Sequence, residues 1–279
     1  MQHVAVVTDS TADFAGAEPA ELNITVVPLT VNWGKDVLRD RIDITTSEFY
    51  DRLQTDREIP RTAAPPLGIF EEVYRNLLSE HDGVVSVHIA SKFSGTHGVA
   101  TTAAANVDGD RIRVIDSATT TVTLGWLAQT AAERARDGAT ADSIVESLTD
   151  MIPRLRIYLT LDTLEYLQRG GRIGRAQAFL GGLLNVKPVL ECHDGEIFPV
   201  ERVRTRPAAL RRVTEIVHEL GPKERIAVAH SDREDDARSF AAEVARQEGM
   251  ESVPIAELGS VVGTHTGPGV LGIGCLLAR

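Results

Sequence analysis

The 279-residue chain has only two cysteines, no long apolar run and no candidate sorting segment. Cys192 and Cys275 lie far apart without a CxxC spacing, which gives no support to a disulfide framework or a zinc site. No stretch approaches the roughly 18 apolar residues of a membrane span, and the N-terminus begins with a strand-like run instead of a secretory signal. We therefore expect a soluble cytoplasmic protein without a metal site, in which both cysteines are core residues.

Positive charge is also scarce. Lys and Arg number 29 against 40 Asp and Glu, so the formal net charge is -11 at pH 7. A field of this sign repels polyanions, so nucleic acid is not an expected partner and any arginine-rich patch is a local exception. The length favours two domains.

The first half alternates strand-like and helix-like segments. Strands are expected at 4–7, 24–31, 83–90 and 111–116, and helices after Thr45, after Pro66 and over 121–136. Thr45 with Glu48 three residues later has the spacing of a capping box. Strands alternating with helices of this length predict an α/β domain with a mainly parallel sheet flanked by helices.

The pattern changes near residue 155, where we expect a domain boundary. The N-terminal domain would cover 1–155 and the C-terminal domain 156–279, with the ligand between them. The later half contains a hairpin signal at Asp194-Gly195, further helices and strands, and a glycine-rich end too rich in glycine for an ordinary strand. We expect this half to be an α/β domain with a mixed sheet.

The segment SKFSGTHG follows an expected strand and begins a helix. Ser94, Gly95 and Thr96 suit a phosphate or carboxylate, because a helix N-terminus presents unpaired N–H groups and glycine permits close approach. Helix capping by the two hydroxyls explains the same residues. A nucleophilic Ser94 has less support, because the G-x-S-x-G elbow is missing and His97 has no evident orienting carboxylate.

Three further segments carry candidate residues. LQRGGRIG places Arg172 among glycines, where it ends a helix or binds an anion. GTHTGPG contains His265 and Gly267 in a segment too rich in glycine for an ordinary strand, where the histidine is structural or a ligand contact. The apolar AFLGGLLNVKPVL is suited to line a narrow channel. VERVRTRPAALRR concentrates arginines that either are solvated or attract an acidic partner, among them Arg202, Arg204 and Arg206.

Taken together, these segments resemble the DegV family of fatty-acid-binding proteins that serve bacterial fatty acid kinase. VTDSTADF, SKFSGTHGVA and VIDSATTTVTLGW are similar to motifs of that family in the first half. TLDTLEYLQRGGRIGRAQAFLGGLLNVKPVL, RVRTRPAAL and HTGPG are similar to motifs in the second half. The resemblance runs almost from end to end, with the motifs in the family's order.

The resemblance implies two α/β domains, with a fatty acid carboxylate between them and its acyl chain in the second. Ser94 and Thr62 would then donate hydrogen bonds to the carboxylate, with Arg172 and His265 nearby. No cofactor and no catalytic residues are implied. The chain departs from the family's usual TSQPS at this point, because it has Thr62 followed by Ala63, Ala64 and Pro65.

The same resemblance implies a long-chain fatty acid as ligand and a separate fatty acid kinase as partner, which would make the acyl phosphate for phospholipid synthesis. Arg202, Arg204 and Arg206 would form the docking patch for that kinase. We expect a monomer that makes transient contact with a membrane.

Two other functions stay open at this point. Ser94 and His265 could hydrolyse an acyl ester or thioester, or the pocket could hold another small acid. Binding of another small acid would be favoured if apolar side chains fill the second domain and leave no channel for an acyl chain. The side chains in question are Phe179, Leu180, Leu183 and Leu184.

Overall fold

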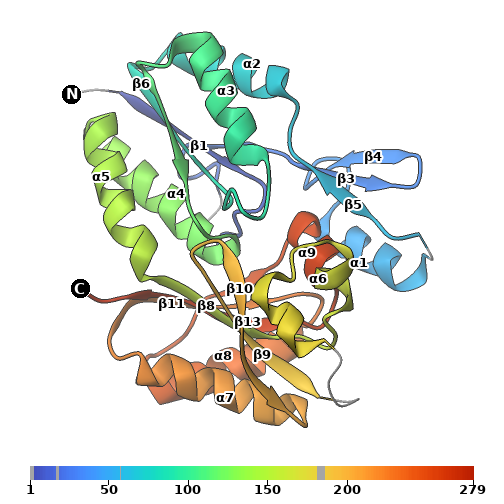
Figure 1. Ribbon diagram of the computed structural model, residues 1–279. Helices are drawn as coiled ribbons and strands as arrows, with labels where there is room; N and C mark the ends of the chain where they lie inside the picture. Colours follow the sequence, from blue (N-terminus) through green and yellow to red (C-terminus); the bar gives the residue numbers. More distant parts are fainter. Residues whose placement is uncertain (1–2, 17–18, 57, 181–185) are drawn as a thin grey trace.

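The computed structural model describes residues 3–16, 19–56, 58–180 and 186–279, and within them the chain forms two helix-flanked sheets and a smaller third sheet (Figure 1). The first sheet is entirely parallel, with the order β2-β1-β6-β7. Its strands are β1 (Val4–Asp9), β2 (Ile24–Val27), β6 (Gly83–His88) and β7 (Ile112–Asp116). Its helices are α2 (Leu67–Leu78), α3 (Thr96–Asp108), α4 (Thr121–Arg136) and α5 (Ala141–Met151). This is the parallel α/β arrangement that the sequence predicts.

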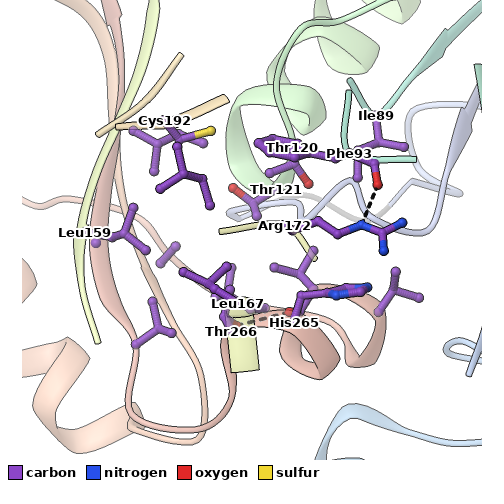
Figure 2. A pocket seen from close by; sticks show the side chains of 18 of the residues that line it. Ile89, Phe93, Thr120, Thr121, Leu159, Leu167, Arg172, Cys192, His265 and Thr266 are labelled. Atoms are coloured by element: carbon purple, nitrogen blue, oxygen red, sulfur yellow. Dashed lines mark hydrogen bonds between the residues drawn. The ribbon is translucent and has the colours of Figure 1, made fainter. Parts of the chain in front are cut away.

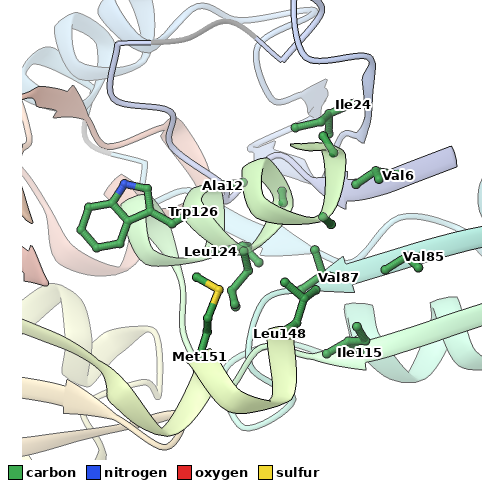
Figure 3. Close-up of a cluster of buried hydrophobic side chains, with 14 of the residues drawn as sticks. Val6, Ala12, Ile24, Val85, Val87, Ile115, Leu124, Trp126, Leu148 and Met151 are labelled. Carbon is green, nitrogen blue, oxygen red and sulfur yellow. The ribbon is translucent and has the colours of Figure 1, made fainter. Parts of the chain in front are cut away.

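The side chains of β1 alternate between two helical layers. Val4 and Val6 pack in a cluster with α4 and α5, whereas Ala5 and Val7 pack in a cluster with α2 and α3. Figure 3 shows the first cluster, in which Leu124 and Leu148 lie beside the strands. A strand buried on both faces is typical of a parallel sheet covered by helices on both sides. The first sheet is therefore the middle of three layers.

The second sheet is mixed and begins at Leu155. Its order is β10-β9-β8-β13-β11-β12, and only β11 and β12 pair in parallel. Its strands are β8 (Leu155–Thr160), β9 (Lys187–His193), β10 (Glu196–Val203), β11 (Lys223–His230), β12 (Ile255–Glu257) and β13 (Leu271–Leu277). α7 (Arg206–Glu219) and α8 (Glu234–Glu248) cover one face, and the other faces the first half of the chain. We keep 1–155 and 156–279 as the proposed domains.

The expected single strand over 24–31 is wrong. β2 ends at Val27, and β3 (Thr30–Trp33) belongs to a separate antiparallel sheet of order β4-β3-β5, with β4 (Asp36–Arg39) and β5 (Arg61–Ala63). Pro28 lies between the two strands, and proline cannot donate to a strand ladder. The third sheet projects from the body of the molecule beside α1 (Thr46–Thr55) (Figure 1).

Local sequence signals for helix ends and turns are confirmed. The Thr45–Glu48 capping box is formed at α1, and α4 has the bounds predicted for it. Asp194 and Gly195 both have positive φ, as expected in the tight turn between β9 and β10. The shorter helices are α6 (Glu165–Arg169), α9 (Ser260–Thr266), η1 (Ile152–Arg154) and η2 (Gly174–Phe179).

The glycine-rich end contains a regular central strand, contrary to expectation. β13 lies between β8 and β11, and its glycines allow close approach of the paired strand β8 at Gly272 and of helix α4 at Gly274. A Cβ at Gly274 would lie 2.5 Å from Cγ2 of Val122 in α4, and one at Gly272 would lie 2.9 Å from the Tyr158 carbonyl. Glycine therefore permits contact between the second sheet and the first half of the chain at this strand.

Candidate functional site

A cavity lies between the two helix-flanked sheets, with about 100 Å³ of space for the centre of a water-sized molecule (Figure 2). Its wall is apolar over much of its area and includes Ile157, Leu159, Leu167, Ile197 and Val270. Four of the predicted ligand-binding residues also line it, namely Thr62, Ser94, Arg172 and His265. These four come from separate segments, so the fold brings together what the sequence keeps apart.

Ser94 lies in the turn between β6 and α3. Its Oγ is 2.8 Å from Thr96 Oγ1 and accepts a hydrogen bond of 3.3 Å from the Thr96 N–H. The N-cap position is Gly95, which has no side-chain capping bond, so capping by Ser94 or Thr96 in the usual N-cap sense is not what the turn shows. When the Thr96 hydroxyl also donates to Ser94, the Ser94 hydroxyl hydrogen is available to an anion.

Thr62 and His265 form a hydrogen bond between β5 and α9. Thr62 Oγ1 lies 2.8 Å from His265 Nε2. Burial, together with the nearby Arg172 charge, lowers the pKa of His265 to about 4, so the imidazole is neutral at pH 7. When Nε2 carries the proton and donates to Thr62, the Thr62 hydroxyl can in turn donate to a carboxylate.

His265 Nδ1 is buried and has no hydrogen-bond partner among the described residues. It faces Gly170, where an added Cβ would lie 2.2 Å from Nδ1. Glycine at this position is therefore what lets α9 approach the end of α6.

Arg172 is the charged group of the cavity wall. Its Nε donates to the Phe93 carbonyl at 2.9 Å (Figure 2). Its Nη1 donates to the Gly170 carbonyl at 2.6 Å. Within the described ranges it forms no ion pair with any carboxylate. A half-buried guanidinium held by neutral carbonyls in a protein of net charge -11 attracts an anion, because nothing in its surroundings neutralises it.

Gly95, Thr96 and Gly267 support the site from outside the cavity wall. A Cβ at Gly95 would meet no heavy atom within 4 Å, so the space at this turn is open. Thr96 is fully buried behind Ser94. Gly267 ends α9 with φ of 72°, and a Cβ there would lie 2.3 Å from the Tyr166 ring, so it fixes how the segment after His265 packs.

The predicted docking arginines have different surroundings. Arg202 donates to the Ala178 carbonyl and lies over the Phe179 ring, and Arg206 donates to the Gly269 carbonyl beside Asp162. Arg204 is exposed and has no ion pair within the described ranges. Of the three arginines, Arg204 is the one that is exposed to solvent and forms no hydrogen bond or ion pair within the described chain.

The side chains named for the channel test fall into two groups. Phe179 and Leu180 are partly buried against the apolar cluster that includes Leu159 and Leu167. Leu183 and Leu184 lie outside the described residues.

The sequence reasoning missed a buried network in the first sheet. Asp9 Oδ2 lies 3.0 Å from His88 Nδ1, and His88 Nε2 lies 2.7 Å from Ser86 Oγ, which is 2.8 Å from the Tyr74 hydroxyl. The carboxylate, imidazole and hydroxyl have the order of a catalytic triad, but all three residues are fully buried and none lines the cavity. Asp9 also accepts from the Ile89 N–H, so the network positions a residue of the cavity wall.

Fold and site define an α/β protein with two helix-flanked sheets and an apolar cavity between them. The polar corner of this cavity, formed by Thr62, Ser94, Arg172 and His265, suits a carboxylate. The chain matches the DegV family, described as an uncharacterised protein family, over residues 3–277. It belongs to that family. A DegV domain-containing protein of Streptomyces coelicolor is 40% identical over 276 residues, which cover 98% of each chain.

Two solved structures of fatty-acid-binding relatives superpose on the whole chain. DegV from Bacillus subtilis, described as a fatty acid binding protein, has a TM-score of 0.88 at 34% identity and covers 99% of this chain and 100% of its own. A DegV family protein from Thermus thermophilus, described by its fatty acid binding, has a TM-score of 0.89 at 32% identity with full coverage of both chains. The resemblance inferred from sequence motifs is confirmed at the level of family and fold.

Proposed function

We propose that this protein binds a long-chain fatty acid, with the carboxylate at Ser94, Thr62 and Arg172 and the acyl chain along the apolar wall of the cavity. The observation that carries the proposal is the Arg172 guanidinium, which is held in the wall by two carbonyls and has no ion pair in the described chain. An arginine and two neutral hydroxyls in one small polar corner are suited to bind a carboxylate. The fatty-acid-binding descriptions of the two structural relatives agree with this ligand class.

In this proposal the apolar wall provides most of the affinity for the fatty acid, and the polar corner determines the orientation in which it binds. Burying an acyl chain contributes about 0.8 kcal/mol per methylene, or roughly 10 kcal/mol for sixteen carbons before the costs of binding. Hydrogen bonds to the carboxylate add about 1.5–3 kcal/mol each. A small polar corner in an apolar pocket is the usual design of a site that binds an amphipathic ligand.

We further propose that the protein is a carrier that presents the carboxylate to a separate kinase for acyl phosphate formation. Ser94 pairs with Thr96 and His265 with Thr62, so the two members of the alternative Ser–His hydrolase are not hydrogen-bonded to each other in this structure. His265 also has no carboxylate orienting it among the described residues. These contacts favour a binding role for the corner over nucleophilic catalysis.

Contact with a kinase through Arg204, transient membrane contact and a monomeric state remain part of this proposal. No helix in the described ranges is long and apolar enough to cross a bilayer.

Native mass spectrometry of the purified protein tests the ligand class. The expected result is one bound fatty acid per chain, identified after organic extraction, or stoichiometric uptake of added palmitate by ligand-free protein. A protein that contains no lipid and rejects added fatty acids would overturn the proposal. If the protein hydrolyses a chromogenic acyl ester and Ser94→Ala abolishes this activity, the hydrolase function would replace the fatty-acid-binding proposal.

A further inference from the structure

Two threonine hydroxyls in the cavity wall lack a hydrogen-bond partner. Thr120 and Thr121 both line the cavity, and Oγ1 of each is buried without a partner among the described residues (Figure 2). Thr121 is only 5% exposed. Native proteins pair nearly all buried hydroxyls, because an unpaired one loses its bonds to water without replacement. A pair of such hydroxyls facing one cavity therefore indicates that a ligand supplies the missing partner.

Thr121 also has an unusual backbone conformation. Its φ is 54°, in the left-handed region that β-branched residues rarely adopt. The Thr121 N–H donates to the Thr11 carbonyl at 3.0 Å, and the Thr121 carbonyl accepts from the Asp13 N–H at 3.3 Å. Residues held in this way by their neighbours are common at ligand sites.

Helix capping does not account for these hydroxyls. Thr120 is the N-cap of the 16-residue helix α4, yet its side chain makes no capping hydrogen bond. The start of the helix is closely packed, since a Cβ at Gly125 would lie 2.5 Å from the Asp13 carbonyl oxygen. This close approach packs the first turns of α4 against the segment that contains Asp13, and the two threonines lie in the cavity wall at the start of that helix.

We propose that Thr120 and Thr121 form a second polar subsite that binds a hydroxyl group on the acyl chain, so that the preferred ligand is a hydroxylated long-chain fatty acid. The inference rests on the proposed fatty-acid-binding function and narrows its ligand class. The surrounding wall is apolar, with Ile157, Leu159 and Ile197 among its residues. An unsubstituted chain leaves both threonine hydroxyls unpaired, whereas an alcohol can donate to one and accept from the other.

The test compares the affinities of palmitate and a series of monohydroxypalmitates that differ in hydroxyl position. We expect at least one regioisomer to bind about tenfold more tightly than palmitate, which corresponds to 1.4 kcal/mol. Thr121→Val and Thr120→Val keep the branched shape without the hydroxyl and should abolish this preference. Thr121→Ser restores a hydroxyl and should retain it. Thr266→Val is the matched control, because the Thr266 hydroxyl in the same cavity already donates to the Val262 carbonyl.

Three results would overturn the subsite. They are palmitate binding at least as tightly as every regioisomer, a hydroxyl preference that survives in the Thr120→Val/Thr121→Val double variant, or equal weakening of palmitate and hydroxypalmitate in Thr121→Val. The last result would make the threonines carboxylate contacts. Failure of palmitate and of the whole series to bind would instead contradict the proposed function itself, so the two failures are distinguishable.

Discussion

Two of the buried polar regions in the described chain differ in how their hydrogen bonds are completed. Asp9, His88 and Ser86 of the first sheet form a continuous chain of hydrogen bonds with Tyr74 of α2 in the protein interior. In the cavity, His265 Nδ1 and two threonine hydroxyls have no partner in the described chain, and Arg172 has no counter-ion there. The contrast agrees with a structural role for the completed triad-like network and with the ligand site proposed at the cavity, where the partners are missing.

Removing Asp9 should have the largest effect on stability. Asp9→Ala leaves the His88 ring, the Ile89 N–H and the Thr11 hydroxyl without their shared acceptor, so we expect a loss of about 3–5 kcal/mol in the free energy of unfolding. Urea denaturation measures it. Asp51→Ala, at an exposed position of α1, is the control and should change stability by less than about 0.5 kcal/mol. A loss below about 1 kcal/mol for Asp9→Ala would show that the network is not structural.

Acid should destabilise the ligand-free protein through His265. Its pKa in the fold is about 4, below the ordinary value of 6.5, so the unfolded chain binds the proton more readily between these two values. The stability that the neutral imidazole contributes is therefore complete above pH 6.5 and falls by up to about 3 kcal/mol as pH decreases to 4. The difference between the unfolding curves of wild type and His265→Gln across this range measures it. Parallel curves would contradict a buried neutral His265.

Neutralising Arg172 should weaken fatty acid binding more than any other change in the polar corner. Arg172→Gln removes the cation facing the carboxylate, and we expect affinity to fall roughly 10- to 100-fold, as for loss of about 1.5–3 kcal/mol of charged hydrogen bonding. Displacement of a fluorescent fatty acid measures it. Arg169→Gln, which removes an exposed arginine paired with Glu165, is the matched control and should bind normally. Equal affinities for both variants would place the carboxylate elsewhere.

Ser94→Ala should have a smaller effect of about tenfold on the same affinity, because one hydrogen bond to a charged group is lost and the apolar wall is unchanged. Isothermal titration calorimetry with palmitate measures the dissociation constants of wild type and variant. An unchanged dissociation constant would remove Ser94 from the site and leave its contact with Thr96 as its only role.

Arg204→Glu should leave fatty acid affinity unchanged, because Arg204 is exposed and does not line the cavity. It should slow kinase-coupled phosphorylation, because it reverses a charge of the proposed docking patch. Rates equal to wild type in a coupled assay with a partner kinase would contradict the docking proposal. Arg202 and Arg206 are less suitable test positions, since each contacts a carbonyl of the fold.

Local signals in the sequence were sufficient for most of the elements. The Thr45 capping box, the Asp194-Gly195 turn and the apolar periodicity over α4 each depend on residues a few positions apart, and each is formed. The strand over 24–31 failed because its apolar residues are divided between two sheets at Pro28, which depends on distant pairing partners.

Those residues of the site that lie in recognisable sequence motifs could be predicted from the sequence. Local sequence features singled out Ser94, Arg172 and His265, the family resemblance added Thr62, and all four line the cavity. The Thr121 conformation and the pairing of Asp9 with His88, which lie 79 residues apart, could not be found, because both depend on contacts made only in the folded chain. No local pattern distinguishes a threonine with a partner from one without.

A crystal structure of the protein with a bound fatty acid tests the central claim most directly. The account predicts the carboxylate within hydrogen-bonding distance of Ser94 Oγ or Thr62 Oγ1, on the side of Arg172, with the acyl chain along Leu159, Leu167 and Ile197. A chain bound in the opposite direction, with its methyl end against Arg172 and the same groups still unpaired, would contradict it.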